Sequence, residues 1–108
     1  MSTFDDFREA ILKDAEDLAK TVLKRGVKEA RADAEAFIKK SAEKLERWTR
    51  LLAAGELSKD EFASLVRSQK DLAELKALTK AGIQASRLQK FREKLTDVVI
   101  DKAFDILL

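Results

Sequence analysis

The chain has 108 residues, 45% of them hydrophobic and 39% charged, and its formal net charge at pH 7 is only +2. This length fits a single helical domain over residues 1–108, and the lack of cysteine excludes disulfides and thiolate metal sites. The acidic opening from Met1 to Asp6 is unlike a secretory signal, and no apolar run approaches the roughly 20 residues needed to cross a bilayer. We therefore expect a soluble, cytoplasmic protein.

A long helix is predicted over about residues 4–53. Small or apolar residues recur there at steps of three, four and four, which corresponds to about 3.67 residues per turn. This seam has twelve positions: Leu12, Ala15, Ala19, Leu23, Gly26, Ala30, Ala34, Phe37, Ser41, Leu45, Trp48 and Leu52. Because the seam passes through Gly26 and no capping side chain follows it, we expect one continuous helix, roughly 75 Å long at 1.5 Å per residue.

A turn is predicted at residues 54–57. Gly55 is a helix stop, and Ser58 followed by Glu61 has the spacing of a capping box. In that motif the serine hydroxyl accepts a hydrogen bond from the backbone amide of Glu61, and the carboxylate accepts one from the amide of Ser58. A second helix is therefore expected to begin at about residue 58.

The second half is predicted to form helices over about residues 58–81 and 83–107. Gly82 has the context of a helix stop, and Ser86 with Gln89 offers a weaker capping box beyond it. The two halves of the chain have similar lengths, and no strand is expected. The predicted fold is all-α: a long antiparallel, coiled-coil-like helical hairpin whose second arm is bent or broken near Gly82.

The open end of such a hairpin would be its most apolar part. A helix that is apolar on most sides has to be buried, and two helices alone cannot cover these residues. An extra helix from the same chain could cover them, but we favour completion of a helical bundle by self-association, most simply as a dimer. The residues expected in this contact are Phe4, Phe7, Ile11, Val99, Phe104, Leu107 and Leu108.

Charge is clustered along the chain. Both ends are mainly acidic, whereas residues 20–31 and 76–94 are mainly basic. The candidate basic band comprises Lys20, Lys24, Arg25, Lys28, Arg31, Arg87, Lys90 and Arg92. In the hairpin the basic stretches would lie side by side and repel each other, so a dimer shifted by about 20 residues would pair acidic ends with basic stretches. This pattern predicts a salt-sensitive dimer.

Catalysis is not expected. The chain lacks histidine, cysteine, tyrosine and asparagine, and it has no glycine-rich phosphate loop. Carboxylate pairs such as Asp14 with Asp17 share helix faces, but the histidine that completes di-metal sites in helical bundles is missing. We predict no catalytic, cofactor-binding or metal-binding residues.

Three non-enzymatic functions remain. The favoured one is a structural or scaffolding protein that acts through helix–helix association with itself or with another helical protein. The first alternative is an amphipathic protein that binds a lipid or polymer surface. The second alternative is weak nucleic-acid binding through the basic band, against which the small net charge and the scarcity of aromatic residues count.

Overall fold

The computed structural model describes residues 3–108, and every regular element in this range is a helix. In chain order these are α1 (Thr3–Leu18), the π-helical turn η1 (Ala19–Leu23), α2 (Val27–Ala53), α3 (Lys59–Ser68), the 3₁₀ turn η2 (Lys70–Leu72), α4 (Lys76–Lys80) and α5 (Ala85–Leu107). The predicted all-α class is confirmed.

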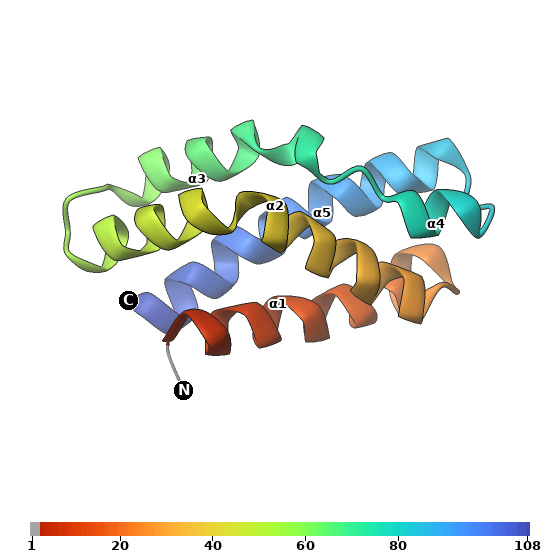
Figure 1. Cartoon of the computed structure of the whole chain (residues 1–108), viewed down its shortest axis with the longest axis horizontal. Coiled ribbons are helices and arrows are strands. Elements are labelled where there is room, and N and C mark those ends of the chain that lie inside the picture. The colour runs from red at the N-terminus through yellow and green to blue at the C-terminus, as the bar shows by residue number, and fades with distance from the viewer. Residues whose placement is uncertain (1–2) are drawn as a thin grey trace.

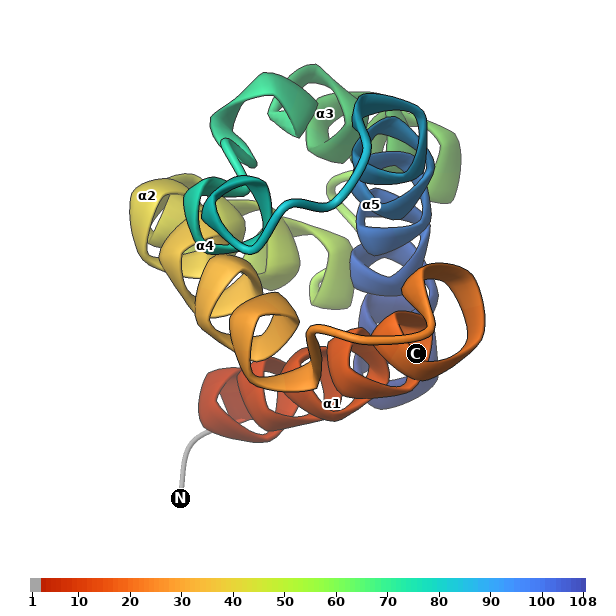
Figure 2. The same cartoon turned by 90° about the vertical axis from the view of Figure 1, so that its right-hand side faces the viewer.

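The helices form a four-sided bundle in which successive sides run in opposite directions (Figures 1 and 2). The first side is α1, the second is α2, the third is α3 followed by α4, and the fourth is α5. α1 packs between α2 and α5, and the third side closes the bundle opposite α1. The bundle measures 42 × 27 × 21 Å, so the predicted two-arm hairpin of roughly 75 Å is wrong.

The helix predicted over residues 4–53 is interrupted at Gly26. Lys24 and Gly26 adopt left-handed backbone conformations, with φ of 65° and 76°, and the chain reverses direction between α1 and α2. A Cβ atom on Gly26 would lie 3.0 Å from Cδ2 of Leu78. Glycine is therefore required both by the turn and by the close approach of α4.

The seam correctly predicts which residues are buried. Eleven of its twelve positions lie in the interior, and Gly26 is half-buried. The lone tryptophan, Trp48, is among the buried residues, as are Phe37 and Leu45. The seam therefore faces other helices of the same chain, because α2 folds back along α1 instead of continuing it.

The turn at residues 54–57 and the capping box are confirmed. The Ser58 amide donates to Glu61 Oε1 over 2.9 Å, and the Glu61 amide donates to Ser58 Oγ over 3.1 Å. The hydrogen bond from the Ser58 backbone lowers the pKa of the Glu61 carboxyl below its usual range. The two hydrogen bonds between Ser58 and Glu61 thus fix the start of α3 at Lys59.

The second half of the chain is broken in two places. The predicted break near Gly82, which has a φ of 85°, is confirmed. α5 begins at Ala85 with Gln84 at its N-cap and no side-chain cap, so the expected capping box at Ser86 and Gln89 does not form.

The helix predicted over residues 58–81 is also wrong, because it is interrupted between α3 and α4. Leu75 takes a left-handed conformation there, with a φ of 56°. The buried carboxylate of Asp33, on α2, accepts hydrogen bonds from the Ala77 amide (2.9 Å) and the Leu78 amide (2.8 Å). A side chain distant in the sequence therefore caps the start of α4.

Replacing Gly26 by alanine is expected to destabilise the fold more than the same change at Gly55. Both glycines have a φ near 75°, but no atom lies within 4 Å of a Cβ at Gly55, whereas Leu78 obstructs one at Gly26. In each variant the left-handed backbone conformation of alanine lowers the free energy of unfolding by about 1–2 kcal/mol. Gly26→Ala should lower it by at least about 1 kcal/mol more, because of the contact with Leu78. Urea unfolding measures both, and equal losses would show that the contact with Leu78 does not matter.

Replacing Asp33 by asparagine is expected to lower the free energy of unfolding by about 2 kcal/mol. One carboxylate oxygen is lost, so an amide at the start of α4 is left without an acceptor. Glu35→Gln is the matched control, because Glu35 lies on the same helix and makes a half-exposed ion pair with Arg8 that contributes little. Similar unfolding midpoints for the two variants in urea would contradict this role of Asp33.

Candidate functional site

Basic residues from two connections gather at one end of the bundle. Residues 20–28, which comprise most of η1, the connection to α2 and the first two residues of α2, lie beside residues 80–90, which run from the end of α4 into the start of α5, at the end that faces the viewer in Figure 2. These two stretches contain seven basic residues and no acidic residue: Lys20, Lys24, Arg25, Lys28, Lys80, Arg87 and Lys90. We call this surface the basic end.

Within residues 3–108, none of these seven side chains forms an ion pair. Some bases farther along the helices are paired: Arg31 lies 2.8 Å from Glu16, and Lys102 lies 3.4 Å from Asp14. Others within residues 3–108, such as Lys39 and Lys44, also have no ion pair. The basic end is therefore distinguished by two stretches that hold bases and no acidic residue, with Glu29 following directly in the first turn of α2.

Six residues of the predicted basic band lie at the basic end, and two do not. Arg31 pairs with Glu16 and Glu9, and the hydrogen bond to Glu16 raises the pKa of its guanidinium. Arg92 donates to the Ala73 carbonyl over 2.7 Å and to Gln89 over 3.0 Å. Arg31 thus links α2 to α1, and Arg92 links α5 to the connection before α4. Lys80 lies at the basic end although it was not in the predicted band.

The two basic stretches lie side by side, as the sequence predicts, but the pairing of acidic with basic residues that was expected across a dimer occurs within one chain. Because α2 folds back on α1, the acidic residues of α1 lie along Arg31, and Arg8 reaches Glu35 on α2 over 3.1 Å. The charge argument for a shifted antiparallel dimer assumed a continuous first helix. These opposite charges are instead paired within one chain.

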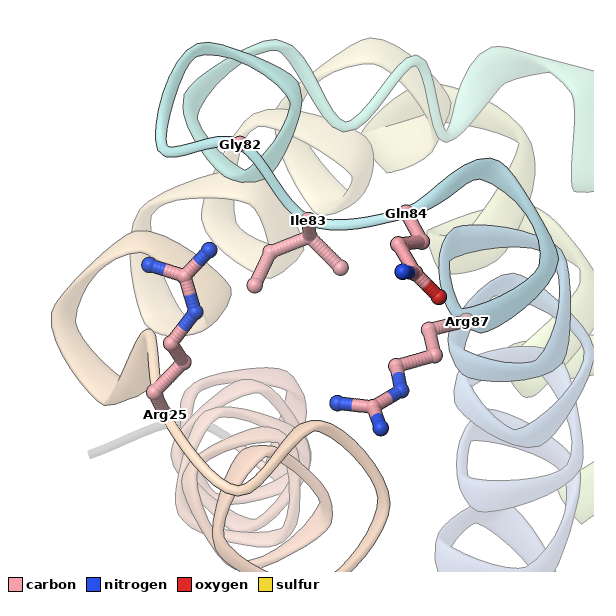
Figure 3. A pocket seen from close by; sticks show the side chains of 5 residues that line it. All are labelled: Arg25, Gly82, Ile83, Gln84 and Arg87. Carbon is pink, nitrogen blue, oxygen red and sulfur yellow. The ribbon is translucent and has the colours of Figure 1, made fainter.

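An open cavity of about 170 Å³ lies in the basic end between Arg25 and Arg87 (Figure 3). Its other lining residues are Gly82, Ile83 and Gln84, so no carboxylate faces it. In Figure 3 the guanidinium of Arg25 lies on one side of the cavity, turned toward Gly82, and that of Arg87 extends from the other side, below Ile83 and Gln84. Nη1 of Arg87 donates to the Leu23 carbonyl over 3.4 Å, which ties its side chain to the end of η1.

The opposite end of the bundle is acidic. Residues 3–9, 54–61 and 97–107 meet there and contain nine acidic and three basic residues. The small net charge of the chain therefore conceals two ends of opposite sign.

The residues predicted for self-association lie largely inside the bundle. Phe7, Ile11 and Val99 are buried in its core, Phe4, Phe104 and Leu107 are partly buried against it, and Leu108 is 61% exposed. The Phe104 ring packs 6.0 Å from that of Phe62, on α3. The apolar end that a two-helix hairpin would leave open is thus covered by helices of the same chain.

The cavity is suited to binding rather than to catalysis. Guanidinium groups stay protonated and donate hydrogen bonds, and the remaining lining offers an amide and an apolar side chain. In residues 3–108 no three carboxylates come close enough together to hold a metal ion. Over the same residues, no helix is sufficiently long and apolar to cross a membrane.

Comparison of the chain with protein-family models, curated proteins and solved structures yields no significant match.

Proposed function

We propose that this chain is a non-enzymatic binding protein whose basic end attaches to the phosphate backbone of nucleic acid. The observation that carries the proposal is the gathering, at one end of the bundle, of two stretches that contain seven bases and no acidic residue. Lysine and arginine residues that replace condensed counterions are the main source of sequence-independent affinity for nucleic acids. The net charge of +2 is a poor guide here, because the opposing charge lies at the other end of the bundle.

The shape of the basic end favours contact with phosphates over reading of bases. It consists of helix ends and their connections, and no helix projects from it that could enter a groove. Phosphate contacts position a protein on a duplex without selecting a sequence. The expected binding is therefore weak, sensitive to salt and indifferent to sequence.

The lipid-surface alternative has less support. The apolar faces of the helices point inward, and the large apolar residues exposed in residues 3–108 are Leu72 and Leu108. An amphipathic helix binds a bilayer through a continuous apolar face, which this bundle would expose only by opening.

The chain is expected to bind a labelled 20-base-pair duplex with an affinity that falls roughly 100-fold when salt rises from about 50 to about 200 mM, as for contact with about four phosphates. Lys20→Glu with Lys28→Glu should weaken binding by about tenfold or more, because both lysines belong to the basic end. Fluorescence anisotropy measures these affinities.

The matched control for this experiment is Lys39→Glu with Lys44→Glu, which makes the same charge change at exposed positions of α2 away from the basic end. Little change is expected in this variant. An equal loss in both pairs, or no binding by the unaltered chain at low salt, would contradict the proposal.

A second candidate function is structural self-association through the two ends. The acidic end of one copy complements the basic end of another, which would give a head-to-tail contact instead of the apolar dimer expected from the sequence. This candidate is the scaffolding function favoured from the sequence, but the copies would associate through their charged ends and not through apolar residues.

Head-to-tail association is expected to be visible at low salt and to disappear at about 0.5 M salt, where the Debye length falls to a few ångströms. Sedimentation velocity at the two salt concentrations measures it, with Lys20→Glu/Lys28→Glu as the variant that should stay monomeric. A single monomeric species at both concentrations would exclude the contact, and association strengthened by salt would indicate an apolar interface.

A further inference from the structure

We infer that the cavity between Arg25 and Arg87 is a binding site for a single phosphate group. The inference deepens the proposed function, on which it rests, because the phosphate would be one of those in the nucleic-acid backbone. It assigns a discrete site to two arginines within the wider basic end.

The two arginines come from connections far apart in the sequence and face one cavity. Arg25 lies in the α1–α2 connection, and Arg87 lies in the first turn of α5. Like charges that face the same space repel each other, and within residues 3–108 neither has an acidic partner. An anion between them would relieve this repulsion and accept hydrogen bonds from both.

The chemistry of the lining selects a phosphate oxyanion. A guanidinium presents a planar fork of N–H donors that matches two oxygens of one phosphate, and opposing forks can hold different oxygens of the same group. The cavity volume of about 170 Å³ is well above the roughly 10–15 Å³ needed to hold one water molecule, so it has room for a polyatomic ion. No carboxylate in the lining would repel the ligand.

The backbone around the cavity supports this arrangement. Nη2 of Arg25 lies 3.5 Å from the place where a Cβ atom on Gly82 would be, so the guanidinium rests against a residue without a side chain. The hydrogen bond from Arg87 to the Leu23 carbonyl engages one nitrogen and leaves the other donors of its fork for a ligand. The side chain of Arg87 is therefore partly positioned before a ligand arrives, which reduces the ordering cost of binding.

The test is calorimetric titration of the full chain with inorganic pyrophosphate, together with the backbone amide spectrum of residues 82–88. We expect saturable binding of one ion per chain, with shifts concentrated in these residues and at Arg25. Arg25→Gln with Arg87→Gln should weaken binding at least about tenfold. Lys20→Gln with Lys28→Gln removes the same charge from the basic end but touches no lining residue, and it should weaken binding less than about threefold.

A third variant separates geometry from charge and guards against a folding defect. Arg25→Lys with Arg87→Lys retains both charges and loses both forks, and it should bind pyrophosphate more weakly than the Lys20→Gln/Lys28→Gln variant. Circular dichroism and thermal melting verify that each variant is folded. Equal losses in the arginine-to-glutamine and lysine-to-glutamine pairs, full binding by the arginine-to-lysine variant, or no saturation by the unaltered chain would overturn the inference.

Titrations with the 20-base-pair duplex and with vesicles of anionic phospholipid identify the source of the phosphate. Saturable pyrophosphate binding without duplex binding would support the phosphate site and contradict the proposed function. Vesicle binding that depends on the two arginines would then assign the phosphate to a lipid headgroup. The converse result is duplex binding that depends on Lys20 and Lys28 but not on Arg25 and Arg87, with no saturable pyrophosphate binding. It would support the proposed function and contradict the phosphate site.

Discussion

The turn between α1 and α2 packs closely against α4 at position 26. A Cβ atom there would lie 3.0 Å from Cδ2 of Leu78, a tight contact that Leu78 would have to relieve by shifting, and the positive φ of Gly26 favours glycine for a second reason. The reversal at this point lets α2 lie along α1 and brings Arg31 to Glu16 and Glu9. It also places the α1–α2 connection beside the α4–α5 connection, so the basic end exists because of this turn.

Asp33 provides the second long-range constraint. Its carboxylate satisfies two amides at the start of α4, a helix of only five residues that could not persist alone. Leu78 belongs to the same short helix, so the residue that packs on Gly26 is positioned by Asp33. A charged side chain in the interior thereby couples the third side of the bundle to the turn between the first two.

The sequence predicted the local features and the buried face, but not the topology. The capping box at Ser58 and Glu61 depends on residues three positions apart, and the seam depends on periodicity alone, so both could be identified without knowing the fold. The break at Gly26 was missed because the seam continues through it in phase, and helices on both sides of a turn can bury the same stripe. The break before α4 was missed because no glycine or proline marks it and its cap comes from another helix.

The candidate site shows the same division between local and long-range information. Most of its bases could be selected as a charge cluster, but in a hairpin they would line the side of a rod, whereas the bundle collects them on one end face. The pairing of Arg25 with Arg87 across a cavity depends on the contact between two connections. The hairpin expected from the sequence also places the two basic stretches side by side, but it does not predict a cavity between these two arginines.

The segregation of charge gives the molecule a direction as well as a charged face. With nine acidic and three basic residues at one end and seven bases without acidic neighbours in their stretches at the other, charge is separated along the 42 Å axis of the bundle and gives it an electric dipole. The field of any highly charged partner therefore exerts a torque on it before contact, so that encounters occur end-on. Once attached to a polyanion, each copy would point its acidic end outward, and the surface it presents to further copies or to other proteins would be negative.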